Sequence, residues 1–314
     1  MEAVISKVIP ILLLFMMGYI FKKTSYFNNE TINGFKKAVI NIGLPAVLFI
    51  TFVNLEFKRE YFALIIIIFV LCMILYFVGK ILNNIPAIQN PILPFLMTGF
   101  CFGLLGIPLY STVFGEANLA ELSVIGVGHE LFVWFVYVSL VKLTFKGEKF
   151  SLKTIKGFIT SPLILAVVIG LFINLAGLSK FFYSQPILNG IYVTVEYLSK
   201  IATPLILIVV GYGLSFNKKY AKLTFIYVII RTVGVLFVGY IIKILFIDNI
   251  IGTNQYFDYS YFTFLILPPP FSLPIFVSEY GTSEDAELAN NVVVLHTCLC
   301  MVIYIGFVFY INLV

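Results

Sequence analysis

The sequence predicts an all-α membrane protein with ten transmembrane helices in two inverted five-helix repeats, in which helices four and nine are broken. Three observations lead to this fold class: the composition, the number of apolar stretches, and prolines that recur at matching places in the two halves. Of the 314 residues, 61% are hydrophobic and 11% are charged. Soluble domains carry about 25% charged residues, so an ordinary globular protein is excluded.

The first half of the chain holds five apolar stretches, each close to the roughly 20 residues that a helix needs to cross a bilayer. The second stretch contains Gly43-Leu44-Pro45, and the fourth contains Gly106-Ile107-Pro108. A loop rich in lysine follows the fifth stretch. The predicted spans of this half are 3–21, 37–55, 61–82, 91–114 and 119–143.

The second half repeats this organisation with five further apolar stretches. Thr203-Pro204 lies in the seventh stretch, and Pro268-Pro269-Pro270 lies in the ninth together with Pro274. We therefore divide the chain into a first repeat, 1–157, which includes the basic loop, and a second repeat, 158–314. The predicted spans of this half are 158–178, 187–216, 223–247, 259–280 and 287–313.

Lysine and arginine gather on one side of these spans, which sets the expected orientation. This side holds Lys22, Lys80, the Lys142–Lys156 cluster and Lys218, and the positive-inside rule places it in the cytoplasm. An even number of spans then puts both termini outside the cell membrane. Because topology accounts for the basic residues, we expect no nucleic-acid partner. The sequence also indicates no cofactor and no metal site.

Proline positions relate the two halves. An offset of 159 residues relates Pro45 to Pro204, and an offset of 166 relates Pro108 to Pro274. Because each half holds an odd number of spans, the two repeats have opposite orientations, which is the construction of many secondary transporters. The same offsets relate Leu55-Glu56-Phe57 to Leu214-Ser215-Phe216, Gly115 to Gly281, and Ala120-Glu121-Leu122 to Ala286-Glu287-Leu288.

The matched prolines predict broken helices near Gly106–Pro108 and Pro268–Pro274. Proline removes a backbone donor and clashes with the carbonyl four residues back. In lipid, non-helical backbone persists only inside protein or beside a water-filled cavity. Half-helix ends offer N–H groups to anions and carbonyls to cations, so two matched breaks indicate a transport site. For a lone proline, a packing kink is the better explanation; for the matched pair, a transport site is.

Ionisable residues inside predicted spans are costly and serve as functional hypotheses. His129 and Glu130 lie in the fifth span, where they can exchange protons near neutral pH. Lys200 follows Glu196 by four residues, so the two can simply neutralise each other. Arg231 lies well inside the eighth span, with snorkelling as the alternative. The candidate charge or proton-coupling residues are His129, Glu130, Lys200 and Arg231, with coupling to H⁺ or Na⁺ left open.

Enzyme motifs are missing from the sequence, so we expect no catalytic activity. His129-Glu130 is not followed by a second histidine at metalloprotease spacing. There is neither a Gly-x-Ser-x-Gly elbow nor a phosphate-binding loop. An intramembrane enzyme that uses His129-Glu130 as its catalytic pair is the alternative.

Short motifs occur in a characteristic order along nearly the whole chain. They include Asn41–Phe49, Gly106-Ile107-Pro108-Leu109, Thr203-Pro204-Leu205, Gly211-Tyr212-Gly213-Leu214, and Pro268-Pro269 with Glu279-Tyr280-Gly281. With these motifs the chain resembles the auxin efflux carrier family, and in particular the bacterial permeases related to the plant PIN auxin carriers.

This resemblance implies ten helices in two inverted repeats, a scaffold and a mobile part, and a substrate site where the fourth and ninth helices cross. It implies alternating-access transport of a small organic anion, such as a carboxylate or an auxin-like compound, and a homodimer in the bilayer. Relatives commonly carry asparagine where this chain has Cys101 and Ser272, so the identity of the anion stays open. An anion channel and a membrane-embedded sensor are the alternatives. The expected substrate-binding residues are Asn41, Cys101, Gly106, Ile107, Pro108, Thr203, Pro269, Ser272 and Pro274.

Overall fold

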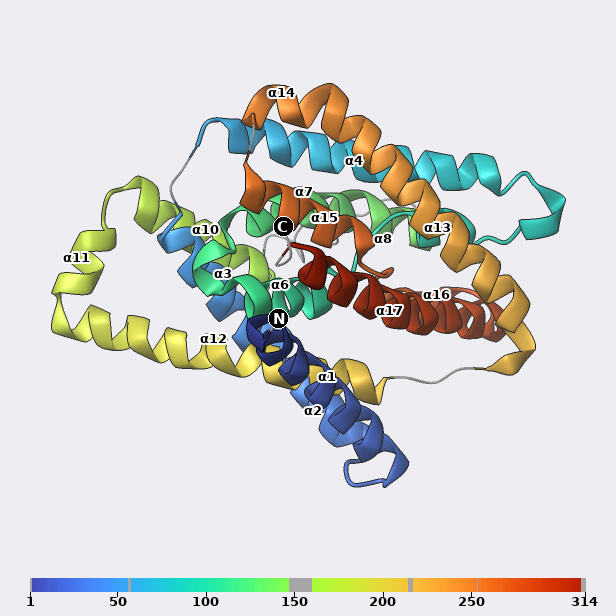
Figure 1. Ribbon diagram of the computed structural model, residues 1–314, viewed down its shortest axis with the longest axis horizontal. Helices are drawn as coiled ribbons and strands as arrows, with labels where there is room; N and C mark the ends of the chain where they lie inside the picture. Colours follow the sequence, from blue (N-terminus) through green and yellow to red (C-terminus); the bar gives the residue numbers. More distant parts are fainter. Residues whose placement is uncertain (1, 56–57, 147–159, 214–216, 253, 312–314) are drawn as a thin grey trace.

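The computed structural model describes residues 2–55, 58–146, 160–213, 217–252 and 254–311, and over these ranges it is helical without any strand (Figure 1). The predicted all-α class is confirmed. The predicted boundary between residues 157 and 158 lies outside the described residues. Seven helical stretches within them are long and apolar enough to cross a membrane: Asn29–Val53, Glu60–Leu82, Leu93–Phe114, Ala120–Phe145, Pro186–Tyr212, Lys218–Ile251 and Ser283–Ile311.

The helices of the first half follow the order of the predicted spans. Short π-helical turns, in which the helix is locally wider, connect α2 to α3 and α7 to α8 and also precede α6. The bounds are α1 Glu2–Lys23, α2 Asn29–Ala38, α3 Leu44–Val53, α4 Glu60–Leu82, α5 Leu93–Met97, α6 Ile107–Phe114, α7 Ala120–Phe132 and α8 Val138–Lys146.

The helices of the second half begin with α10, and the short helix α11 lies between α10 and α12. A polar cap begins α15, because the Asn254 side chain accepts the N–H of Phe257 at 3.1 Å. The bounds are α10 Pro162–Leu175, α11 Ser179–Ser184, α12 Pro186–Tyr212, α13 Ala221–Ile242, α14 Asp248–Ile251, α15 Gln255–Ile266, α16 Leu273–Tyr280 and α17 Ser283–Ile311.

The predicted break at Gly106–Pro108 is wrong in position. The chain is continuously helical from Phe102 to Phe114, through a π-helical turn at Phe102–Gly106 and then α6. Pro108 occupies the first turn of α6, where proline is tolerated because the preceding π-helical turn changes the hydrogen-bond register. The fourth predicted span is interrupted earlier instead, at residues 98–101.

One group of helices, α1, α3, α10 and α12, packs through close backbone contacts. A Cβ atom on Gly18 of α1 would collide with the carbonyl of Ile208 in α12, and one on Gly211 of α12 would collide with the carbonyl of Phe15 in α1. The glycines therefore let α1 and α12 approach backbone to backbone, as small residues do in membrane helices. We call these four helices the first group.

The remaining long helices form a second group, which contains α4, α7, α13, α15, α16 and α17 together with α5 and α6. Figure 1 shows α10, α11 and α12 toward one end of the molecule and α13, α16 and α17 toward the other. Most of the Leu93–Phe114 stretch is buried, more than in the other membrane-length stretches of the described chain. The broken fourth span thus lies at the centre of the structure.

Candidate functional site

Two non-helical segments interrupt the centre of the molecule. Residues 98–101 separate α5 from the π-helical turn before α6, and residues 267–272 separate α15 from α16. Gly99 adopts a φ of +72°, in the left-handed region that favours glycine. A Cβ atom at this position would also lie 3.1 Å from the ring of Pro270 and 3.1 Å from the ring of Tyr137.

These two segments contact each other directly. The N–H of Cys101 donates a hydrogen bond to the carbonyl of Pro268 at 2.8 Å. A Cβ atom on Gly106 would lie 2.8 Å from Leu267, so the π-helical turn also packs closely on the second segment. We call this contact between residues 98–101 and 267–272 the crossing.

Arg231 of α13 binds the crossing from one side. Its Nη2 donates to the carbonyls of Gly99 at 2.9 Å and Leu267 at 3.0 Å, and its Nη1 donates to the carbonyl of Leu96. The guanidinium also lies 4.9 Å from the ring centroid of Phe100. The side chain is buried, at 1% exposure, so it does not snorkel. The bound carbonyls lie at or just beyond the C-terminal ends of α5 and α15, where helix dipoles carry partial negative charge.

His129 of α7 binds the same segment from another side. The N–H of Phe100 donates to His129 Nε2 at 2.9 Å, and His129 Nδ1 lies 3.5 Å from Glu130 Oε1. The imidazole is surrounded by the rings of Phe100, Phe102 and Phe264. The two ionisable residues predicted in the fifth span are therefore tied to the broken fourth span.

A cavity of about 450 Å³ lies beside the crossing, on the side that carries the basic residues. Phe271, Pro274 and Ile275 line it from the second break and the first turn of α16. Lys22 and Lys36 line it from the ends of α1 and α2. Its polar side chains also include the amides of Asn29, Asn33 and Asn290.

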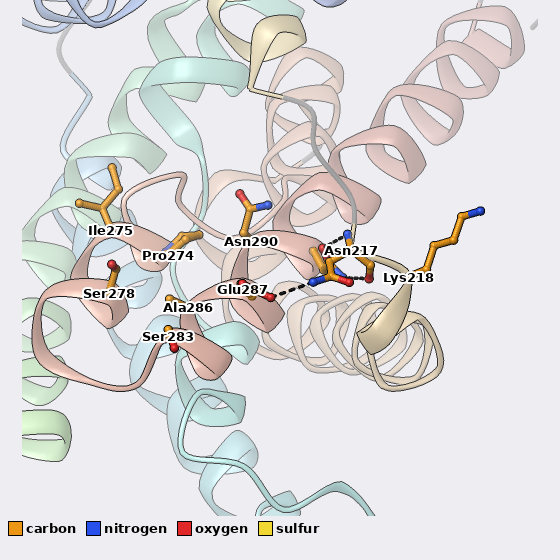
Figure 2. Close-up of a pocket in the computed structure, with 10 residues that line it drawn as sticks. Asn217, Lys218, Pro274, Ile275, Ser278, Ser283, Ala286, Glu287 and Asn290 are labelled. Carbon is orange, nitrogen blue, oxygen red and sulfur yellow. Dashed lines mark hydrogen bonds between the residues drawn. The ribbon is translucent and has the colours of Figure 1, made fainter. Parts of the chain in front are cut away.

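A wider cavity of about 1000 Å³ shares Pro274, Ile275 and Asn290 with the first. Figure 2 shows Asn217 beside Glu287, while Lys218 extends away from the other labelled residues. Asn217 Nδ2 donates to Glu287 Oε2 at 2.8 Å. The shared residues indicate that the two cavities form one polar approach to the crossing from the basic side.

Asn217 also binds a second residue of α17. Its N–H donates to Asn291 Oδ1 at 2.9 Å, and Asn291 Nδ2 donates to the Asn217 carbonyl at 2.7 Å. This reciprocal pair holds Asn217, just before the second group of helices, against α17.

The structure brings several predicted substrate residues to the crossing. Cys101 and Pro269 are buried within the two breaks, and Ser272 ends the second break immediately before α16. Pro274 lines the cavity in the first turn of α16. Ile107 faces a small cavity next to Glu130 instead.

Other predicted residues are not among those that line the two polar cavities beside the crossing. Asn41 is exposed in the π-helical turn between α2 and α3, and Thr203 is half-buried in α12. Lys200 lies on an exposed face of α12 and pairs with Glu196 at 2.9 Å, the neutralising arrangement that the sequence allowed.

Lys36 was missed by the sequence reasoning because it immediately precedes the span that was predicted to begin at residue 37. A signal was present nonetheless. Asn29, Asn33 and Lys36 recur at intervals of four and three residues, which places them on one face of a helix. The structure confirms that α2 directs all three into the same cavity.

Comparison with protein families decides the class of this chain. The model of the membrane transport protein family matches residues 3–308. The chain belongs to this family. The resemblance drawn from the sequence motifs is thus confirmed at the level of the family. For this membrane transport protein, a comparison with curated proteins finds no match.

Proposed function

We propose that this membrane transport protein is an alternating-access secondary carrier of a small organic anion, such as a carboxylate or an auxin-like compound, in the cell membrane. The observation that carries the proposal is the cavity of about 450 Å³, which places Lys36 and the first turn of α16 beside two broken helices in contact. Small-molecule sites have volumes of about 300–1,000 Å³, so this cavity suits a small carboxylate.

The charges around the cavity favour an anion. Lys22 and Lys36 supply positive charge, and α16 begins at the cavity with its partially positive N-terminal end. The amide side chains of Asn29, Asn33 and Asn290 can donate hydrogen bonds to carboxylate oxygens. Arg231 is already bound to three carbonyls, so we assign the anion to Lys36 rather than to Arg231.

The packing of the first group supports ten spans in two inverted repeats. The first helix of each half packs on the second long helix of the other half, α1 on α12 and α10 on α3. Both contacts use glycine, since a Cβ atom on Gly170 of α10 would lie 3.0 Å from the carbonyl of Phe49 in α3. Such exchanged packing is expected from two related halves. In this proposal the first group is the scaffold and the second group moves.

The proposal also includes orientation and assembly. The polar approach opens on the basic side, so this conformation faces the cytoplasm, and both termini lie outside. A homodimer in the lipid bilayer is part of the proposal, as the family resemblance implies.

Transport in proteoliposomes tests the proposal. Labelled malonate, malate and an aromatic carboxylate are offered to the purified protein and to its Lys36→Gln variant. Losing one charge-assisted contact of about 1.5–3 kcal/mol corresponds to a decrease of about 10- to 100-fold in affinity. Lys200→Gln, on the exposed face of α12, is the matched control and should transport normally. If Lys36→Gln and the wild type bind the anion with equal affinity, the anion does not bind in this cavity.

Counterflow separates a carrier from the alternatives. A carrier shows faster uptake of labelled anion when unlabelled anion is present on the opposite side of the membrane. A channel of the same fold shows flux without this stimulation, and a sensor binds the anion without flux. If flux occurs and stimulation does not, the alternating-access mechanism is wrong.

A further inference from the structure

We propose that His129 and Glu130 form a proton-binding pair that couples H⁺ to the crossing, so that one proton moves together with the anion. This inference rests on the proposed function, because coupling requires a carrier. The pair is not among the residues that line the anion cavity, and His129 and Arg231 bind the backbone of the same residue 98–101 segment, at Phe100 and at Gly99.

The hydrogen bond from Phe100 defines the neutral state of the pair. His129 Nε2 accepts this bond at 2.9 Å, so the neutral ring carries its proton on Nδ1. Nδ1 lies 3.5 Å from Glu130 Oε1, and the imidazole is 1% exposed. A second proton on the ring must occupy Nε2, because Nδ1 already holds one. Protonated His129 therefore cannot accept the Phe100 N–H.

Loss of that acceptor affects both broken helices. An unpaired buried N–H is unfavourable, so protonation of His129 favours another conformation of the residue 98–101 segment. The neighbours of Phe100 are Gly99, which binds Arg231, and Cys101, which binds Pro268. A change at Phe100 is thus transmitted to the second break through two existing hydrogen bonds.

Glu130 lies at the boundary between the two groups of helices. It lines a cavity of about 20 Å³ whose wall includes Leu48 and Leu163 of the first group and Ser123 of the second. This volume accommodates one water molecule. The Ser123 Oγ is buried and has no hydrogen-bond partner among the described residues, so it can bind that water beside the carboxylate.

The position of Glu130 makes the movement of the two groups depend on its charge. Moving an ionised carboxylate past apolar side chains such as Leu48 and Leu163 costs more than moving a neutral carboxyl group. When a proton occupies His129 Nε2 and the Nδ1 proton passes to Glu130, one added proton both removes the acceptor of the Phe100 N–H and neutralises the carboxylate. Neutral Glu130 lets the second group slide along the first, whereas the ionised form resists. Proton binding to the pair is therefore linked directly to the movement of the second group along the first.

Proton binding and anion binding both act on the crossing. α3, α4, α10 and α15 place apolar side chains around the pair. From the first break, Cys101 interacts electrostatically with Glu130 and also with Lys36 of α2; from α13, Arg231 stacks on Phe100, whose N–H binds His129. Phe271 of the second break lines the anion cavity, while His129 binds Phe100 of the first break. Because both sites contact the crossing, anion and proton are expected to bind together. The apolar neighbours are Leu48, Ile65, Ile68, Leu163, Val167 and Phe264.

The test measures uptake of labelled malonate, malate or an aromatic carboxylate into proteoliposomes with and without a pH gradient. For one proton moved per anion, an inward gradient of one pH unit should raise accumulation about tenfold, because one unit is worth about 1.4 kcal/mol. An entrapped pH-sensitive dye should report acidification inside the vesicles during uptake. Replacing the pH gradient by a Na⁺ gradient should not stimulate uptake.

Two variants remove proton binding with little change of shape. In His129→Gln the amide oxygen can still accept the Phe100 N–H, and Glu130→Gln keeps the volume of the side chain. Both should lose the tenfold stimulation and the acidification while counterflow remains measurable, which shows that the protein is folded. Glu121→Gln, also on α7, is the matched control and should keep both responses.

The outcomes distinguish this inference from the proposed function. If no carboxylate shows counterflow in the wild type, the proposed function fails and the proton pair fails with it. Counterflow without any response to the pH gradient, or stimulation by Na⁺ instead, overturns only the proton pair. A normal pH response in both glutamine variants would do the same.

Discussion

Broken helices leave backbone carbonyls unpaired inside a membrane protein, and Arg231 binds three such carbonyls with one side chain. Its guanidinium binds carbonyls of Leu96, Gly99 and Leu267, which the interruptions of two helices leave without helical partners. A positive charge at two helix C-terminal ends is favourable, and the planar group can donate to all three carbonyls together. The cost of burying the arginine is offset by these contacts and by the Phe100 ring.

Substitution of Arg231 should therefore weaken folding more than a surface change. Arg231→Lys keeps the charge but loses the planar fork, so at least one carbonyl loses its donor at a cost of about 1–3 kcal/mol. Arg231→Met removes every donor and should destabilise the protein further. Thermal unfolding in detergent measures both, with Lys200→Met as control. If Arg231→Met unfolds at the wild-type temperature, the three hydrogen bonds do not stabilise the crossing.

Sequence reasoning identified Arg231 and His129 because ionisable side chains are rare in apolar spans. It could not identify the backbone groups that they bind, at Leu96, Gly99, Phe100 and Leu267. Every residue has a backbone carbonyl and nearly every residue a backbone N–H, so the side chains in the sequence do not indicate which of these groups are bound. Lys36 was missed because its residue type is not unusual at its position. It lies near the end of a span, where lysine is common and usually serves topology alone.

At the scale of elements, glycine rather than proline sets the first break. The sequence placed the interruption at Pro108, but proline disturbs only its own N–H and the turn before it, and a π-helical turn accommodates both. Pro45 is accommodated in the same way, in the first turn of α3 directly after the π-helical turn at Val39–Gly43. The second break was placed correctly, because three consecutive prolines at residues 268–270 remove three adjacent donors.

Gly99→Ala tests this reading of the first break. The methyl group would meet Pro270 and Tyr137 at 3.1 Å, and a φ of +72° costs a non-glycine residue about 1–2 kcal/mol before any clash. We expect lower thermal stability in detergent and slower anion uptake. Gly306→Ala in α17 is the control, because a Cβ atom there meets nothing within 4 Å and helix propensity favours alanine. Equal effects of the two changes would contradict the role of Gly99.

At the scale of the whole molecule, the sequence was most informative about the helical class, the breaks and the charge distribution. The order of helices and the basic side near the cavity follow from hydropathy and lysine positions, whereas the contact between the fourth and ninth spans was expected from the family resemblance. The assignment of helices to two groups did not follow, because it depends on which apolar faces pack together, and most faces here are apolar. Close glycine contacts such as Gly18 with Ile208 became visible only in three dimensions.

Movement between the two groups can be tested by cross-linking across their boundary. Leu48 of α3 and Val127 of α7 line the same small cavity from opposite groups, so cysteines at both positions can be joined by a short bifunctional methanethiosulfonate reagent. If the second group moves against the first during each cycle, the cross-linked protein should lose counterflow, and a reducing agent should restore it. Leu48 and Val167 line that cavity from the same group, so a pair of cysteines at these two positions should keep counterflow after treatment with the reagent.

Of the native cysteines, Cys298 is replaced by serine beforehand because it is partly exposed. Continued counterflow in the first cross-linked pair would mean that the boundary does not move, and inhibition of both pairs would mean that the reagent disturbs the cavity itself.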